Sequence, residues 1–212
     1  MKALRMTLMV AAVIALAGTA MADNTVHVET YAALNGTNYG LSVDIDGSTN
    51  NAYVEDQTPD TESTYRATFW LDPNTLSMAN WDRFAVFLVK APGNVNVGRM
   101  QLQYAAGNYR IRFSCLNNGL TWKFARLGGT GQKALPIGDG PIQVTLEAVY
   151  LGSNQGYCGM SAGGVDHWNG GYQAGNYSVD KVRLGATKNM GAVTVSGEFY
   201  VDEFESFRTL AP

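Results

Sequence analysis

Residues 166–173 bring aromatic, acidic and amide side chains together with two glycines. Trp168 and Tyr172 stand among glycine and polar neighbours, so their rings are hard to bury. Exposed aromatic faces stack on the apolar side of a pyranose ring, and nearby polar groups bind its hydroxyls. We therefore expect Trp168 and Tyr172 to contact a glycan.

A second candidate surface lies in residues 65–72. Positions 65, 67, 69 and 71 are apolar and alternate with a second set, as in a strand with one buried face. Trp70 is out of phase with the apolar set and shares its side with Arg66. We expect Trp70 and Arg66 to bind ligand, joined by Arg110, Arg112 and Lys123 if the later strands pair suitably. The alternative is that Trp70 only packs in a layer of the protein.

Groups suited to catalysis are few. Asp202, Glu203 and Glu205 form an acidic cluster, and strand alternation predicts Glu203 and Glu205 on one face and Asp202 on the other. Glycoside hydrolysis needs two carboxylates about 5–9 Å apart across the sugar bond. Only His27 and His167 could supply imidazole, and no Gly-x-Ser-x-Gly nucleophile motif occurs. We assign no catalytic residue and favour binding over catalysis.

The amino-terminal segment predicts export. Lys2 and Arg5 precede an apolar run at positions 8–17, and Ala-Met-Ala at 20–22 is a small-x-small cleavage site. We expect a signal peptide at 1–22, a mature domain at 23–212, and secretion to the periplasm or the exterior. The alternative, a membrane helix, is disfavoured because the apolar run is short and no later segment resembles a span.

Cys115 and Cys158 are the two cysteines of the chain. An even pair in a secreted protein predicts one disulfide. Two free thiols are the alternative. With two cysteines and two histidines, a zinc site of the usual type is not expected.

The composition indicates a folded domain that does not bind nucleic acid. Of 212 residues, 46% are hydrophobic, 11% aromatic and 16% charged, which disfavours disorder. The isoelectric point near 5.3 provides little electrostatic basis for binding nucleic acid.

Alternation of apolar and polar residues recurs along the chain and predicts strands. The expected ranges are 26–33, 38–45, 52–55, 65–71, 82–90, 97–105, 109–115, 120–126, 142–148, 179–186 and 193–206. Turn sequences rich in Asn and Gly separate them, and 97–126 is expected to form a three-stranded meander with a three-residue first loop. So many short strands predict a single all-β domain, a two-sheet antiparallel β-sandwich or jelly roll.

Three stretches resemble an uncharacterised bacterial secreted domain of the concanavalin A-like, laminin G-like jelly-roll class. They are residues 53–73 (beginning Tyr-Val-Glu-Asp-Gln-Thr-Pro), 179–186 (Val-Asp-Lys-Val-Arg-Leu-Gly-Ala) and 199–208 (Phe-Tyr-Val-Asp-Glu-Phe-Glu-Ser-Phe-Arg). The resemblance covers roughly residues 26–208 and implies two curved antiparallel sheets with the chain ends close together. Where members carry a Trp-Ile-Asp-Gly-like strand, residues 157–164 read Tyr-Cys-Gly-Met-Ser-Ala-Gly-Gly.

Such domains often hold one structural calcium ion through carboxylates and carbonyl oxygens. Their first and last strands commonly adjoin, so Glu29 and Asp202 are the expected ligands. A solvated strand edge without metal is the alternative.

We expect a non-catalytic module that binds a carbohydrate or another cell-surface or matrix polymer. The alternative is a polysaccharide-degrading enzyme. Alginate-lyase-like enzymes carry Tyr-x-x-Ala-Gly-x-Tyr, and Tyr-Gln-Ala-Gly-Asn-Tyr at 172–177 is similar to it, without the accompanying Gln-x-His. A third possibility is a structural module of an extracellular matrix that binds no small ligand.

Overall fold

The computed structural model describes residues 23–57, 59–188, 190 and 193–207. These residues form two antiparallel sheets, which confirms the expected β-sandwich of jelly-roll type. The expected signal peptide, residues 1–22, lies outside the described residues and stays a prediction.

One sheet has nine strands and is called the nine-stranded sheet below. Eight of them run in the order β1 (Thr25–Glu29), β2 (Gly40–Ile45), β16 (Val195–Phe207), β4 (Thr64–Asp72), β12 (Ile142–Val149), β13 (Gly156–Ala162), β14 (Val165–Tyr172) and β10 (Arg126–Leu127). The ninth, β5 (Ser77–Met78), pairs with β16.

The other sheet has seven strands and is called the seven-stranded sheet. Six of them run in the order β11 (Leu135–Ile137), β8 (Asn108–Leu116), β7 (Val95–Ala105), β6 (Arg83–Ala91), β15 (Lys181–Lys188) and β3 (Ala52–Asp56). The seventh, β9 (Trp122–Phe124), pairs with β8, and a 3-10 turn, η2 (Pro92–Asn94), joins β6 to β7. Among the described residues, no helix is long and apolar enough to cross a membrane.

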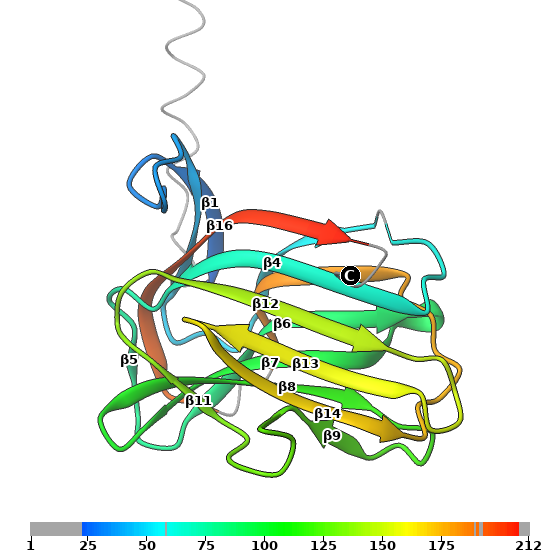
Figure 1. The fold of residues 1–212 in the computed structure, drawn as a ribbon. Helices are drawn as coiled ribbons and strands as arrows, with labels where there is room; N and C mark the ends of the chain where they lie inside the picture. Colours follow the sequence, from blue (N-terminus) through cyan, green and yellow to red (C-terminus); the bar gives the residue numbers. More distant parts are fainter. Residues whose placement is uncertain (1–22, 58, 189, 191–192, 208–212) are drawn as a thin grey trace, which may run out of the picture.

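The hydrophobic core lies between the two sheets. Figure 1 shows β4, β12, β13 and β14 in a layer over β6, β7 and β8. The alternating apolar residues of β4, among them Phe69, are fully buried, and the Phe69 ring stacks on that of Phe87 from β6 at 5.7 Å. Strand β4 therefore points its apolar set inward and leaves its polar set on the outer face of its sheet, whereas β6 is buried along almost its whole length.

The meander expected over residues 97–126 is confirmed as β7, β8 and β9. Its first connection is shorter than expected, because Ala105 pairs directly with Asn108. The two residues between them, Ala106 and Gly107, both have positive φ (52° and 78°), as tight hairpin turns require.

Cys115 and Cys158 face each other across the core. Cys115 lies on β8 of the seven-stranded sheet and Cys158 on β13 of the nine-stranded sheet. Both are buried free thiols in the structure, and their sulfur atoms are 2.7 Å apart. The disulfide is therefore not shown and stays a prediction, with its two partners in contact.

Charge is divided unequally between the two sheets. The strands of the nine-stranded sheet contain two basic residues (Arg66 and Arg126) and nine acidic ones (Glu29, Asp44, Asp72, Glu147, Asp166, Glu198, Asp202, Glu203 and Glu205). The strands of the seven-stranded sheet contain nine basic residues (Arg83, Lys90, Arg99, Arg110, Arg112, Lys123, Lys181, Arg183 and Lys188) and two acidic ones (Glu55 and Asp56). The two outer faces therefore offer ligands different chemistry.

Candidate functional site

The outer face of the nine-stranded sheet holds most of the site residues expected from the sequence. The strand register sets Arg66 of β4 opposite Glu147 of β12, Glu147 opposite Gly159 of β13, and Gly159 opposite Trp168 of β14. Neighbouring strands are about 4.8 Å apart, so these four residues form one row across the sheet.

A hollow of about 300 Å³ lies along this row and is called the Trp168 groove. The side chains that define it are Thr145, Glu147, Tyr157, Ser161, Asp166 and Trp168. It thus combines two aromatic rings, two carboxylates and three hydroxyls, the set of groups that sugar recognition uses.

Glycines give Tyr157 its position in the groove. A Cβ atom on Gly159 would stand 2.6 Å from the Tyr157 ring, and one on Gly170 would stand 3.3 Å from it. The ring therefore lies close over the backbone of β13 and β14. Burial raises the pKa of the Tyr157 hydroxyl, and the negative charges of Glu147 and Asp166 raise it further, so the hydroxyl is a neutral donor at physiological pH.

Trp168 is open to solvent on one side and supported on the other. Its side chain is 43% exposed. A Cβ atom on Gly129, in the turn after β10, would come within 2.9 Å of the indole ring. Close backbone support limits the motion of the ring, which lowers the entropy cost of stacking a ligand on it.

Arg66 and Trp70 lie on the same outer face, as expected. The Nε atom of Arg66 is 3.8 Å from a Glu147 carboxylate oxygen, and its guanidinium lies over the ring of Phe207. Trp70 is half-buried between Asp202 and Gln143 on the flanking strands, and its indole N–H has no hydrogen-bond partner among the described residues. Arg66 borders the Trp168 groove through Glu147.

Tyr172 does not share the surface of Trp168, and the expectation that both rings are unburied is wrong. Its side chain is only 8% exposed and packs in the core. The register between β13 and β14 shifts at this point, and Gly171 has a φ of 68°. The extra residue of this bulge reverses the alternation, so Tyr172 points inward although it is four residues after Trp168.

The expectation that Arg110, Arg112 and Lys123 join Trp70 is also wrong. Arg110 and Arg112 belong to β8 and Lys123 to β9, both in the seven-stranded sheet, whereas Trp70 belongs to the nine-stranded sheet. The two outer faces point in opposite directions, so these arginines form a separate surface. Alternation along β9 sets Lys123 on the other side of the strand from Trp122 and Phe124.

Alternation also fails in the acidic cluster of β16. Register shifts between Asp202 and Glu205, and Glu203 adopts a φ of 48°. Asp202 and Glu205 are consequently paired with Trp70 and Thr68, which share the outer face. The expected separation of Asp202 from Glu205 is wrong because of this bulge.

Glu29 and Asp202 do not lie on adjoining strands, contrary to the expectation, because β2 separates β1 from β16. The Asp202 carboxylate accepts hydrogen bonds from the Leu34 amide, at 2.7 Å, and from the Thr37 hydroxyl, so it anchors the β1–β2 loop. Across the described residues, no group of three or more His, Cys, Asp or Glu side chains could hold a metal ion. A bound calcium ion stays a prediction. A melting temperature that does not change when calcium is added would contradict it.

Of the two histidines, only His167 lies at the Trp168 groove, and it contributes to the lining with its side chain buried. His167 is buried on the inner side of β14, where burial lowers the pKa of its imidazole. His27 lies on the edge strand β1, with its Nε2 atom 2.9 Å from the Thr25 hydroxyl. In the lyase-like segment 172–177, Tyr172 is buried and Tyr177 packs edge-on against Tyr150. That segment therefore presents no tyrosine to a ligand in the groove.

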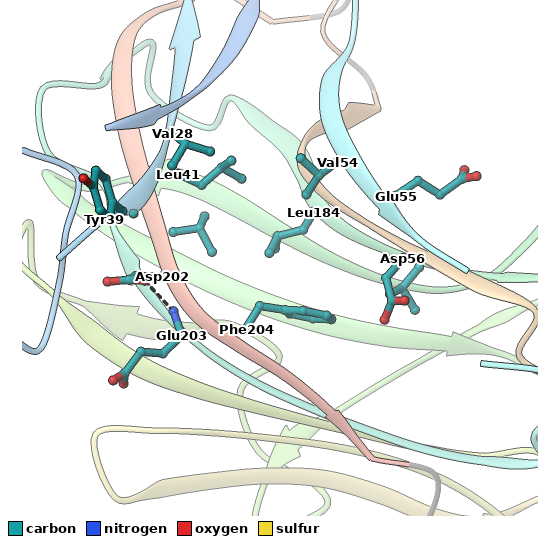
Figure 2. A pocket seen from close by; sticks show the side chains of 13 residues that line it. Val28, Tyr39, Leu41, Val54, Glu55, Asp56, Leu184, Asp202, Glu203 and Phe204 are labelled. Atoms are coloured by element: carbon teal, nitrogen blue, oxygen red, sulfur yellow. Dashed lines mark hydrogen bonds between the residues drawn. The ribbon is translucent and has the colours of Figure 1, made fainter. Parts of the chain in front are cut away.

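A second hollow, of about 290 Å³, lies at the open edge of the sandwich. Figure 2 shows apolar side chains from both sheets at its centre, such as Leu41 and Leu184, with acidic residues around them. These carboxylates already have partners within the chain: Glu55 accepts from Arg183, and Asp202 accepts from Leu34 and from the Glu203 amide. The hollow therefore offers mainly an apolar surface.

The sequence did not identify Tyr157 and Glu147 as groove residues. Alternation over 142–148 places Glu147 on a polar face, but it does not reveal that Trp168 shares this face. Gly159 and Gly170 were the available sequence signal, because residues without a side chain leave room for an aromatic ring over the backbone. Their effect depends on the pairing of β13 with β14.

No family model matches the chain, and no curated protein matches it either. Its fold is similar to that of an endo-β-1,4-glucuronan lyase from the fungus Trichoderma reesei, with a TM-score of 0.58, 14% identity and 87% of each chain covered. It is also similar to the cellulose-induced protein Cip1, with a TM-score of 0.56, 11% identity, and 88% of this chain and 86% of that chain covered. A third similar structure is the alginate lyase Aly36B in complex with an alginate trisaccharide, with a TM-score of 0.51, 14% identity, and 84% and 78% covered. At these identities, the likeness shows the jelly-roll β-sandwich fold that the chains share.

Proposed function

We propose that this protein is a secreted, non-catalytic carbohydrate-binding module whose glycan lies in the Trp168 groove. The observation that carries the proposal is the exposed, backbone-supported Trp168 ring beside Tyr157, Glu147 and Asp166 in one hollow. The indole face can stack on a pyranose ring while the carboxylates and hydroxyls accept and donate hydrogen bonds to sugar hydroxyls.

The charge of the groove favours a neutral glycan. Glu147 and Asp166 contribute two negative charges, and Arg66 balances one of them through its ion pair with Glu147. An anionic sugar would meet net repulsion there. The similar structures, which include two polysaccharide lyases and a cellulose-induced protein, add support for a role with polysaccharides.

Replacing the stacking ring tests this proposal directly. Trp168→Ala should reduce retention of the mature protein on insoluble cellulose, chitin or β-1,3-glucan by about tenfold. The reason is that stacking one indole face on a sugar ring, and burying it there, contributes about 1–2 kcal/mol to the binding free energy. Trp81→Ala is the matched control, since Trp81 is 64% exposed in the turn before β6 and lies outside the groove. Equal retention of the wild type and Trp168→Ala would show that the glycan does not bind in the Trp168 groove.

An enzyme on the same fold is the alternative function. The two carboxylates of the groove are the observation that favours it, because glycosidases act through such pairs. Incubation with neutral glycans and with uronate polymers should release neither reducing ends nor unsaturated ends if the protein only binds. Turnover that is lost in Glu147→Gln would replace the binding proposal with an enzymatic one. Self-association without glycan retention would instead favour the structural-module alternative.

A further inference from the structure

The outer face of the seven-stranded sheet carries basic and aromatic side chains, with the buried Leu88 and Ser114 between them. The strand register aligns Arg183, Leu88, Arg99, Ser114 and Phe124 in one row across β15, β6, β7, β8 and β9. Four strand spacings separate its ends, a length of about 19 Å. The row is therefore longer than a single sugar ring, and it crosses the whole middle of the sheet.

Aromatic rings hold the guanidinium groups of this face in place. The Arg99 guanidinium lies 4.1 Å from the centre of the Trp122 ring, and the Arg112 guanidinium lies 4.5 Å from that of Phe124. Such cation–π contacts orient the planar groups. The Arg99 Nε donates to the Ser114 hydroxyl at 3.4 Å, which leaves the other N–H groups of this guanidinium for a ligand.

The positive charge of this face is poorly balanced. Among the described residues, ion pairs within 4.0 Å engage Arg183 and Lys181, both with Glu55, but none engages Arg83, Arg99, Arg110 or Arg112. Burial lowers the pKa of Arg99 and Arg112, and the charge of Arg83 lowers both further. These arginines thus repel one another in a partly desolvated setting, which an anionic ligand would relieve.

Unpartnered donors and a hollow mark where the ligand would lie. The buried Nε atoms of Arg110 and Arg112 have no hydrogen-bond partner in the described part of the chain. Beside them is a hollow of about 350 Å³ whose charged lining consists of Arg110, Arg112, Arg126 and Lys133. No carboxylate lines it, in contrast to the Trp168 groove.

We infer that this basic face is a second binding site, which takes an anionic polysaccharide bearing carboxylates, such as a polyuronate. Paired guanidinium donors match the two oxygens of a carboxylate. A chain with one carboxylate per sugar can place its carboxylates at different arginines of this face. The inference is independent of the proposed function, since the two hollows share no lining residue, although Arg126 on β10 of the nine-stranded sheet also lines the basic hollow.

The arrangement of the aromatic rings favours a polysaccharide over a nucleic acid. Proteins that bind single-stranded nucleic acids use open aromatic faces on which bases stack. Here, guanidinium groups cover a face of Trp122 and of Phe124. A second cation, Lys133, also lies 4.9 Å from the centre of the Phe124 ring. Recognition therefore depends on charge and hydrogen bonds to carboxylates, with the rings acting as supports.

The test compares two polymers with the same sugar backbone, one with free carboxylates and one with methyl-esterified carboxyl groups. Polygalacturonate should bind the mature protein at low ionic strength, whereas its fully methyl-esterified form should bind at least about tenfold more weakly. Binding of polygalacturonate should weaken as salt is raised, because screening shortens the reach of the exposed charges. Isothermal titration calorimetry measures both effects.

Charge-removing variants locate the site. Arg112→Gln should weaken polygalacturonate binding about tenfold. Arg83 is exposed, so Arg83→Gln provides a second variant that removes a charge and leaves the cation–π pairs intact. Lys123→Gln is the matched control, because it removes the same charge from the opposite side of the neighbouring strand. The inference is overturned by equal affinity for the two polymers, by wild-type affinity in both arginine variants, or by single-stranded DNA that binds as tightly as polygalacturonate.

Discussion

At the scale of single residues, the role of a side chain in the groove depends on neighbours that only the folded sheet brings to it. Gly159 and Gly170 look like turn or strand-breaking residues in the sequence, but in the sheet they make room for the Tyr157 ring. Trp168 could be predicted as exposed because its neighbours are small and polar. Tyr157 could not be predicted as its partner, since that requires the register of β13 against β14.

Glu55 is the acidic partner within the otherwise basic face of the seven-stranded sheet. Its carboxylate accepts a 2.7 Å hydrogen bond from the Nε of Arg183 and lies 3.4 Å from the Lys181 ammonium. The Arg183 hydrogen bond, followed by those from Gln57 and Lys181, lowers the pKa of Glu55 from 4.5 to about 2. The folded state therefore binds this proton less readily than the unfolded chain does.

This depressed pKa predicts a pH-dependent contribution to stability. The ionised Glu55 stabilises the fold above about pH 4.5, and the contribution is lost as the pH falls from 4.5 towards 2. Glu55→Gln should lower the melting temperature by roughly 2–6 °C at pH 7. The difference from wild type should shrink at pH 4 and shrink further as the pH approaches 2, in melts followed by circular dichroism. A difference that stays constant over this range would show that Glu55 acts through packing alone.

At the scale of elements, alternation predicted the strands but not their assembly. Residues 65–71, 97–105 and 109–115 were recognisable because their apolar residues recur at every second position and turn residues separate the runs. Nothing in this local pattern states which sheet a strand joins. The expectation that Trp70 and Arg110 share a face therefore failed, because β4 and β8 belong to different sheets.

Two bulges account for the remaining errors in side-chain direction. The bulge at Gly171 turns Tyr172 into the core, and the one around Glu203 brings Asp202 and Glu205 opposite residues of one face. A bulge inserts one residue and so reverses the phase of everything that follows it. The Gly170–Gly171 pair was a usable sequence signal for the first bulge. Glu203 gave no such signal for the second, because it is not a glycine.

The contact between β8 and β13 predicts a covalent link between the two sheets. Cys115 and Cys158 are buried and touching, and the bond would close a 43-residue loop, which contributes about 4 kcal/mol in the chain-entropy model. Protein secreted to an oxidising compartment should have a mass two hydrogens below that of the dithiol. Its melting temperature should fall by roughly 10 °C after reduction under denaturing conditions and refolding with reductant.

The Cys115→Ala/Cys158→Ala double variant controls for effects of the reductant, since its melting temperature should not respond to it. Burial raises the pKa of the Cys158 thiol, so a reduced folded protein should resist alkylation. Two thiols that titrate in the denatured, untreated protein would contradict the disulfide.

At the scale of the whole molecule, the net charge conceals the most informative property of the surface. A formal charge of −3 and an isoelectric point near 5.3 describe an acidic protein, and on that basis nucleic acid was not expected as a partner. The fold sorts the same residues into an acidic and a basic sheet. This division depends on strand order and could not be predicted from composition.

Two opposite faces with different chemistry predict that one molecule can bridge two polymers. The mature protein should recruit fluorescent polygalacturonate onto the insoluble neutral glycan that retains it best, because the two sites do not overlap. Trp168→Ala should reduce recruitment in proportion to the protein that it releases from the solid. Arg112→Gln should weaken recruitment while the protein stays bound. Raised salt should release the polygalacturonate first, because the contacts of the basic face are ionic and those of the Trp168 ring are not. Displacement of the protein from the solid by soluble polygalacturonate would mean that the two polymers compete for one site, and the bridging model would then be wrong.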